Sequence, residues 1–210
     1  MKYKNIIFDL DGTLWDSTTS IAENWNEVLA RHNLLERPLV ASDMHPYMGL
    51  LIGDVLKTIF PEITEEFIQK IIAEIIDNER KVLHKNGGTL YENVQKTLEE
   101  LAENHNLYIV SNALDGYIQA FVEYFNFQEL FKDFESHGAT GKNKAENIQL
   151  LMARNHLKPT ETVYVGDTQT DYLSAKENDL DFIFCAYGFG ELDENLETLR
   201  ISNFADLLQI

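Results

Sequence analysis

The sequence has a single cysteine, no long apolar run and no recognisable export signal. The one cysteine among 210 residues, Cys185, excludes a disulfide bond within the chain. Because Cys185 lies in an apolar run, we expect a buried structural thiol rather than a catalytic one. No apolar stretch approaches the roughly 20 residues that a membrane-spanning helix needs. The start MKYKNIIFDLDG also lacks the long apolar segment of a secretory signal, so we expect a cytoplasmic protein.

Basic residues are also scarce. The chain has 17 lysines and arginines against 35 aspartates and glutamates, which gives a formal net charge of -18. Such a charge repels nucleic acids and anionic membrane surfaces at long range, so neither is an expected partner. A small anionic substrate is not excluded, because a metal ion and one or two lysines can reverse the potential inside a cleft. With 44% hydrophobic residues the chain can bury a core as one domain, with or without an insertion.

Short apolar runs alternate with amphipathic segments of helical length. Five runs predict buried strands: Asn5–Leu10, Leu107–Val110, Phe131–Glu135, Thr162–Val165 and Phe182–Ala186. Helices are predicted between them at Asn93–Glu103, Gly116–Phe125, Asn143–Asn155 and Thr170–Asn178. Because the strands are apolar throughout rather than alternating, we expect a parallel sheet covered on both faces, in an α/β, Rossmann-like doubly wound fold.

One interval breaks this alternation. From about Asp16 to Lys85 only helical patterns occur, at Ile21–His32, Met48–Ile59 and Glu65–Leu83. We therefore expect a helical cap over residues 16–87, inserted into a core of residues 1–15 and 88–210. The apolar stripe of its last helix is typical of core packing rather than of a cofactor site. Flexible linkers at both ends, one of them Asn86-Gly87-Gly88, would let the insertion open and close as a lid.

Polar residues gather where the predicted strands end. In an open α/β sheet, ligands bind beyond the carboxyl ends of the strands. The residues found there are Asp9, Asp11, Gly12, Thr13, Ser111, Asn112, Gly166, Asp167 and Asp171, and Lys142 and Lys144 begin the helix before the fourth strand. Converging carboxylates repel one another and lose solvation, so they need a cation. Mg²⁺ fits best, because it prefers hard oxygen ligands such as Asp9, Asp167 and the backbone carbonyl of Asp11.

These residue types suit phosphoryl transfer. A carboxylate such as Asp9 can attack phosphorus and form an acyl phosphate, which divides one slow hydrolysis into two easier steps. A second carboxyl group can protonate the leaving oxygen and then activate water, and Asp11 lies on the same side of an extended segment. Ser111, backbone amides and a lysine can stabilise the charge on the transferring group.

In this order the residues resemble the haloacid dehalogenase superfamily, on its phosphatase side, with a helical cap after the first motif. The matching motifs are Asp9-Leu10-Asp11-Gly12-Thr13, Ser111, Lys144, and Gly166-Asp167 with Asp171. The resemblance implies Asp9 as nucleophile, Asp11 as general acid and base, Thr13, Ser111, Asn112 and Lys144 at the phosphate, and Asp9, Asp11, Asp167 and Asp171 around Mg²⁺. It also implies that the first strand lies between the second and the fourth.

Each motif alone also has a structural explanation. A D-x-D-G sequence after a strand can be a polar turn, Ser111 and Asn112 are ordinary turn residues, and Asp171 can be an acid at a helix start. Their occurrence in order at successive strand ends favours catalysis. Lys142 and Lys144 both lie near the third motif, and the following residues, Ala145 to Ile148, favour Lys144.

Several functions remain open at this point. We expect hydrolysis of a small phosphomonoester, such as phosphoglycolate or a sugar phosphate, by a monomer or homodimer, because the chain resembles phosphoglycolate phosphatase-like and β-phosphoglucomutase-like members. A phosphomutase is the closest alternative, since it differs mainly in how the cap admits a second hydroxyl. A dehalogenase has no need of Asp11, and a catalytically silent phosphate-binding protein would have lost motifs. Residues 45–53 are expected to select the substrate, with His45 either a contact or a solvated loop residue.

Overall fold

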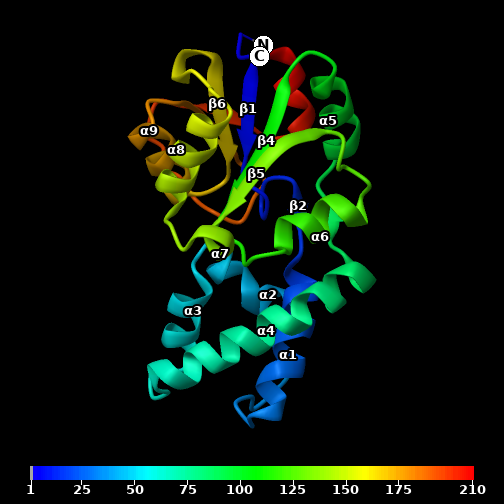
Figure 1. Ribbon diagram of the computed structural model, residues 1–210, viewed down its shortest axis with the longest axis vertical. Helices are drawn as coiled ribbons and strands as arrows, with labels where there is room; N and C mark the ends of the chain where they lie inside the picture. Colours follow the sequence, from blue (N-terminus) through cyan, green and yellow to red (C-terminus); the bar gives the residue numbers. More distant parts are fainter. Residues whose placement is uncertain (1) are drawn as a thin grey trace.

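The structure is a computed structural model that describes residues 2–210, apart from the side chain of Arg80. Its centre is a six-stranded parallel sheet in the order β5-β4-β1-β6-β7-β8 (Figure 1). The strands are β1 (Asn5–Phe8), β4 (Asn106–Ser111), β5 (Phe131–Ser136), β6 (Thr162–Gly166), β7 (Asp181–Cys185) and β8 (Leu199–Ile201). β1 lies between β4 and β6, as the resemblance implied, and the predicted doubly wound α/β fold is confirmed.

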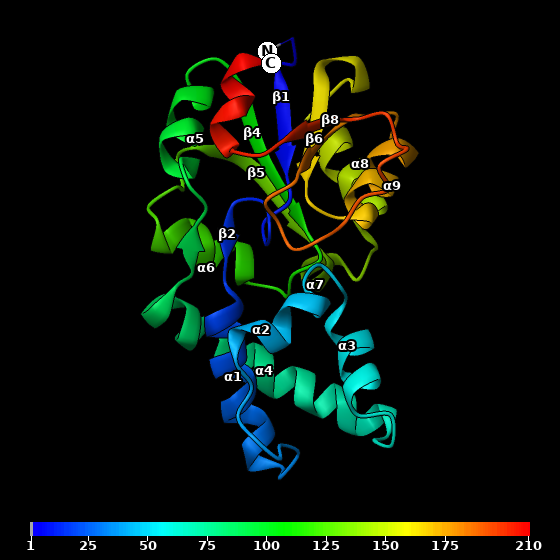
Figure 2. The same cartoon turned by 180° about the vertical axis from the view of Figure 1, so that it is seen from behind.

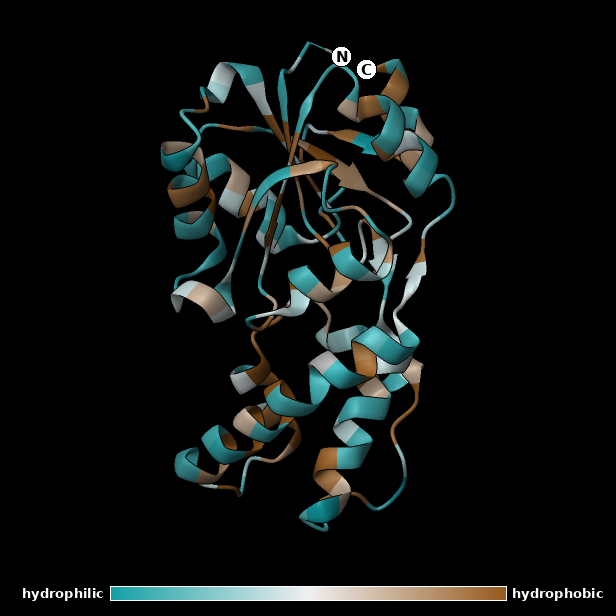
Figure 3. Cartoon of the chain, turned by 45° about the vertical axis from the view of Figure 1, so that its right-hand side comes forward, coloured by the Kyte–Doolittle hydropathy of each residue, from teal (hydrophilic) through white to brown (hydrophobic). Residues whose placement is uncertain are grey.

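Helices cover both faces of the sheet (Figures 1 and 2). One face packs against α5 (Val94–Ala102), α6 (Tyr117–Tyr124) and η3 (Phe204–Gln209), and the other against α8 (Lys144–Arg154) and α9 (Gln169–Glu177). Within β1, Ile6 and Phe8 belong to the first core and Ile7 to the second, as the two-residue period of a strand requires. Figure 3 accordingly shows hydrophobic strands enclosed by helices with hydrophilic outer sides.

The sequence analysis did not predict three short strands. They are β8, which completes the sheet at one edge, and the antiparallel pair β2 (Trp15–Asp16) and β3 (Thr89–Leu90). Strands of two or three residues are too short to show an apolar period, and their pairing is decided by distant partners. Two further short helical segments, α7 (His137–Thr140) and η2 (Pro159–Glu161), lie in connections.

A separate helical group lies between β2 and β3. It consists of α1 (Thr18–Arg31), α2 (Ala41–Met44), η1 (His45–Tyr47), α3 (Ile52–Ile59) and α4 (Glu65–Asn86). These helices enclose a core of their own, at the end of the molecule opposite the two termini (Figures 1 and 2). The predicted helix Met48–Ile59 was too long, because Met48–Leu51 form a loop in which Gly49 has φ of +78°. No helix of residues 2–210, the 22-residue α4 included, is both long and apolar enough to cross a membrane.

The two strands β2 and β3 form a neck between the helical group and the sheet. Trp15 pairs with Leu90, and Asp16 with Thr89. The glycines that precede β3 are tightly packed: a Cβ on Gly87 would lie 2.3 Å from the Tyr124 ring, and one on Gly88 2.6 Å from the Trp15 ring. The return from the helical group is therefore packed and paired in this conformation, and the flexibility expected of Asn86-Gly87-Gly88 stays a prediction.

Candidate active site

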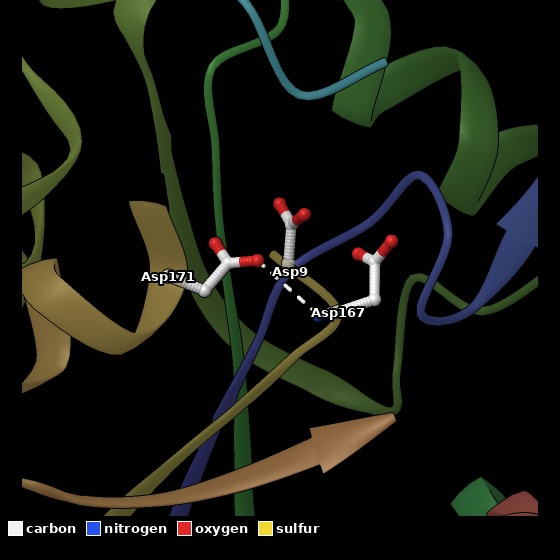
Figure 4. A group of neighbouring side chains, drawn as sticks. All are labelled: Asp9, Asp167 and Asp171. Carbon is white, nitrogen blue, oxygen red and sulfur yellow. Dashed lines mark hydrogen bonds between the residues drawn. The ribbon is translucent and has the colours of Figure 1, made fainter. Parts of the chain in front are cut away.

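Three buried carboxylates meet at the carboxyl end of the sheet. Asp9 follows β1, Asp167 follows β6, and Asp171 lies in the first turn of α9, each at most 1% exposed. One carboxylate oxygen from each residue lies within 4.8 Å of one from each of the others. Figure 4 shows the three groups side by side, with a hydrogen bond from the backbone amide of Asp167 to Asp171. The structure thus brings together three of the carboxylates that the sequence analysis placed around Mg²⁺.

Glycines let the chain close around Asp167. Gly12 has φ of +83°, and a Cβ there would lie 2.2 Å from Oδ2 of Asp167. A Cβ on Gly188 would lie 2.3 Å from the Asp167 Cβ. The amides of Phe189 and Gly190 donate to the same Oδ2, at 2.9 and 3.2 Å. The loop after β7 therefore borders the site and fixes the Asp167 carboxylate, a role for which only glycine is small enough at positions 12 and 188.

Lys144 is the lysine that reaches the carboxylates. Its ammonium donates to Oδ1 of Asp171 at 2.6 Å and lies 3.0 Å from Oδ1 of Asp9, and its side chain is buried. The contact with Asp9 is an ion pair without hydrogen-bond geometry. The Oδ1 atom of Asp9, which is buried, therefore has no hydrogen-bond partner. Lys142 is half-exposed and lies 3.8 Å from Glu146. Asn143 and Glu146 cap the start of α8 and thereby orient Lys144.

Both carboxylate oxygens of Asp171 already accept hydrogen bonds. Its Oδ2 accepts from the amide and hydroxyl of Thr168, at 2.9 and 2.7 Å, and from the amide of Asp167 at 3.2 Å, while Oδ1 accepts from Lys144. Asp171 therefore holds the start of α9 and the Lys144 ammonium. The unpartnered oxygen of Asp9 and the nearby Asp167 are better available to a cation. A buried carboxylate oxygen without a hydrogen-bond partner, in an all-oxygen donor set, fits a hard divalent ion such as Mg²⁺.

The carboxylate of Asp11 is held by hydroxyl groups and does not belong to the group of three. Its Oδ1 accepts hydrogen bonds from the Ser17 hydroxyl at 2.6 Å and the Tyr117 hydroxyl at 2.8 Å. It lies outside the metal-compatible group of described residues, so a contribution of Asp11 to metal binding, through its backbone carbonyl, stays a prediction. Burial raises the pKa of Asp11 to about 6, although the two donors oppose the rise. A carboxyl group with a pKa near neutrality can both give and take a proton.

The pKa values of Asp9 and Asp167 are raised because these carboxyl groups are buried close to another carboxylate. Burial, and then the charge of Asp171, raise the pKa of Asp9 well above its usual range, while Lys144 opposes the rise. The same two causes raise the pKa of Asp167 to about 7, against the amides of Phe189 and Gly190. The site therefore carries excess negative charge that a cation would relieve.

The residues predicted to contact phosphate lie around these carboxylates in different ways. Thr13 is buried, and its hydroxyl donates to Oδ1 of Asp167 at 3.3 Å. The Ser111 oxygen accepts from the amide of Ala113, also at 3.3 Å. Asn112 donates to the carbonyl of Gly49 at 2.9 Å, and its own carbonyl oxygen is buried without a partner. Ser111 and Asn112 line the cavity described next, whereas Thr13 supports Asp167 in this conformation.

A cavity of about 90 Å³ opens over Asp9, between the sheet and the helical group. Its floor includes Asp9, Asp11, Ser111 and Asn112, and its other walls come from Ile21, Trp25, Met44, Tyr47, Met48, Gly49, Leu50, Ile52, Val55, Glu79, Ala113, Leu114 and Tyr117. His45 lies outside it, exposed, with its ring 5.2 Å from that of Phe189.

The sequence analysis missed Glu79, Ser17 and Tyr117. One signal could have found Glu79: it lies four residues after Ile75 and four before Leu83, and so falls within the apolar stripe of α4. Ser17 and Tyr117 carry no such signal, since ordinary hydroxyl side chains reach Asp11 only through the fold.

Comparison with known proteins finds one family. Residues 6–185 match the haloacid dehalogenase-like hydrolases. The chain is 30% identical over 202 residues to a 5'-nucleotidase of Pseudomonas aeruginosa, which covers 92% of this chain and 87% of that protein. It is 28% identical over 225 residues to a phosphoglycolate phosphatase of Mannheimia succiniciproducens, and the aligned region covers 100% of this chain and 98% of that protein.

Solved structures agree on the fold. A haloacid dehalogenase-like family hydrolase from Streptococcus pneumoniae superposes with a TM-score of 0.84 at 21% identity, over 99% of this chain and 98% of that one. CbbY from Rhodobacter sphaeroides, solved in complex with phosphate, superposes with a TM-score of 0.82 at 16% identity, over 98% of this chain and 96% of that one. At such identities the likeness concerns the fold alone.

Proposed function

Because this chain belongs to the haloacid dehalogenase-like hydrolases and is a phosphatase, we propose that it hydrolyses a small phosphomonoester through a phosphate bound covalently to Asp9, with Mg²⁺. The observation that carries the proposal is the Asp9 carboxylate. Its Oδ1 is buried, lacks a hydrogen-bond partner and lies 3.0 Å from the Lys144 ammonium, and Asp9 lines the cavity. A nucleophile needs such a free, oriented oxygen at the substrate.

In the first step an Asp9 oxygen forms a bond to phosphorus while the bond from phosphorus to the leaving oxygen breaks. Asp11 gives its proton to the leaving oxygen, so that the alcohol departs neutral. In the second step Asp11 takes a proton from water, whose oxygen attacks phosphorus and frees Asp9 and phosphate. The pKa of Asp11, about 6, suits both transfers at neutral pH.

The surrounding residues hold the reacting groups. Lys144 favours the ionised form of Asp9 and lies where it can also attract the phosphoryl oxygens, and Ser111 supplies a hydroxyl donor. Asp9 and Asp167, with Asp171 behind them, would hold Mg²⁺, which supplies charge neutralisation for the transferring phosphoryl group when bound. Residues 16–87 act as a cap that shields the cavity from water over a core of residues 1–15 and 88–210.

The test is phosphate release from a panel of esters, including phosphoglycolate, a hexose phosphate and a nucleoside 5'-monophosphate. We expect release that requires Mg²⁺, stops with chelator and falls by about a thousandfold or more in Asp9→Asn. Mass spectrometry of the acid-quenched enzyme should find phosphate on the peptide that contains Asp9.

Asp179→Asn is the matched control, because Asp179 is exposed and has φ of +57°, a conformation that asparagine also adopts. Undiminished release by a folded Asp9→Asn variant would refute the nucleophile. Transfer of phosphate to a second hydroxyl of the substrate, in place of release, would favour the phosphomutase alternative.

A further inference from the structure

A glutamate of the cap lies in the cavity without a partner. Glu79, on α4, is 7% exposed and lines the cavity together with Asp9 and Asp11. Among the described residues no hydrogen bond or ion pair to its carboxyl group is found. The preceding residue is different: Asn78 donates to Asn24 at 3.1 Å and to Glu27 at 2.8 Å. Burying most of a carboxyl group without a protein partner costs free energy, and a ligand in the cavity can supply that partner.

The rest of the cavity wall defines what can meet Glu79. Trp25, Tyr47 and Tyr117 contribute aromatic rings, and most other wall residues are aliphatic or methionine. Among the described side chains that line the cavity, the only charged ones are carboxyl groups, and none is a lysine, arginine or histidine. Burial, and then the charge of Asp11, raise the pKa of Glu79 to about 8. A positive charge placed among these groups would offset both effects.

Ammonium groups bind well in such surroundings. Aromatic faces attract cations, most strongly where water is excluded, and a carboxylate supplies the counter-charge. A carboxylate in the same place would meet acidic groups only and would lose its solvation without compensation. We therefore expect the cavity to distinguish substrates by the charge on their alcohol portion, and to favour a positive charge there.

We propose that the preferred substrates are phosphate esters of amino alcohols, whose ammonium group pairs with Glu79 in the cavity. The inference rests on the proposed function, because it places the phosphate at Asp9 and Lys144 and the leaving alcohol beneath the cap. It also predicts that phosphoglycolate, whose alcohol part carries a carboxylate, is a poor substrate.

Three esters of nearly equal size test the proposal: 2-aminoethyl phosphate, 2-hydroxyethyl phosphate and phosphoglycolate. At pH 7.5 with Mg²⁺ we expect kcat/KM to fall about tenfold or more from the ammonium ester to the hydroxyl ester, and further to phosphoglycolate. Glu79→Gln keeps the shape of the side chain without the charge, and should bring the ammonium ester to within about threefold of the hydroxyl ester. Glu66→Gln, on the exposed side of the same helix, should leave the preference unchanged.

A second measurement needs no variant. The product 2-aminoethanol should inhibit the enzyme at concentrations about tenfold lower than ethylene glycol does. Equal inhibition, an equal or greater rate with 2-hydroxyethyl phosphate, or a preference that survives in Glu79→Gln would each overturn the inference and leave the phosphatase intact. Release from other esters but from none of these three would also overturn it. Release from no ester at all would instead refute the proposed function, and this inference with it.

Discussion

At the scale of single residues, the ammonium of Lys144 forms ion pairs with two buried carboxylates, those of Asp9 and Asp171. Burial alone would lower the pKa of Lys144, but the charges of Asp171 and Asp9 outweigh it and raise the pKa above its usual range. The lysine therefore carries its charge at neutral pH. Removing one partner of a buried ion pair costs about 3–5 kcal/mol, because the remaining charges are left uncompensated.

Lys144→Met, which keeps most of the side-chain volume, should therefore lower the free energy of unfolding by about 3–5 kcal/mol and abolish phosphate release. Lys142→Met is the matched control, and because Lys142 is half-exposed its effect on stability should be within about 0.5 kcal/mol. Urea unfolding and phosphate release measure both effects. Similar losses in the two variants would contradict the assignment of Lys144.

Asp167 allows a test of metal binding that does not depend on turnover. Without Mg²⁺, Asp167→Asn removes one of three crowded charges and should leave the melting temperature equal to or above that of the wild type. At a Mg²⁺ concentration of about 100 Kd the wild type should gain about 5–10 °C. The variant should gain little, because it has lost a ligand. An equal gain in both proteins would argue against Asp167 as a ligand.

At the scale of elements, the neck between the helical group and the sheet is tightly packed. A Cβ on Gly88 would lie 2.8 Å from the backbone oxygen of Asp16, in addition to its contact with the Trp15 ring. Gly53, inside α3, has room: its Cβ would lie 3.9 Å from Ile72. The same substitution should therefore have opposite effects at the two positions.

Gly88→Ala should lower the free energy of unfolding by about 1–3 kcal/mol, because backbone and ring must move apart. Gly53→Ala should raise it by about 0.5–1 kcal/mol, because alanine is the better helix former. Chemical denaturation of the two variants gives the comparison. Two stabilising substitutions would show that the neck is looser than its contacts indicate.

At the scale of the whole molecule, Glu79 couples stability to pH. Its pKa in the folded state, about 8, lies above the ordinary value of 4.5. Between these values the unfolded chain has lost the proton that the folded protein retains, so this group's contribution to stability falls as pH rises and levels off above about pH 8. The charge of Asp11 also disfavours the ionisation of Glu79, and the charge of Glu79 in turn raises the pKa of the neighbouring Tyr117 hydroxyl. Asp77 and Asp115 line a second cavity with Glu79.

Glu79→Gln removes this dependence. The free energy of unfolding of the variant relative to wild type should therefore increase by roughly 2–5 kcal/mol between pH 5 and pH 8. Unfolding by urea at several pH values measures the difference. A difference that stays constant over this range would mean that Glu79 ionises normally in the folded protein.

The sequence by itself determined the sheet, the helical insertion and the family. Apolar runs and turn residues are local signals, so five of the six sheet strands and the order of the polar motifs after them could be read along the chain. The predicted cytoplasmic location and oligomeric state stay predictions. β8 and the neck strands could not be predicted, because pairing over such short lengths depends on partners far away in the sequence.

The tertiary structure decided which polar residues meet and which way they face. Lys142 and Lys144 are two residues apart, yet only Lys144 lies beside Asp9, because the capped start of α8 orients it inward. Asp11 lines the same cavity as Asp9 but is held by Ser17 and Tyr117, partners that no spacing in the sequence indicated. Glu79 faces a cavity formed by segments that are distant in sequence. Side-chain direction and burial depend on such long-range contacts, which no local pattern contains.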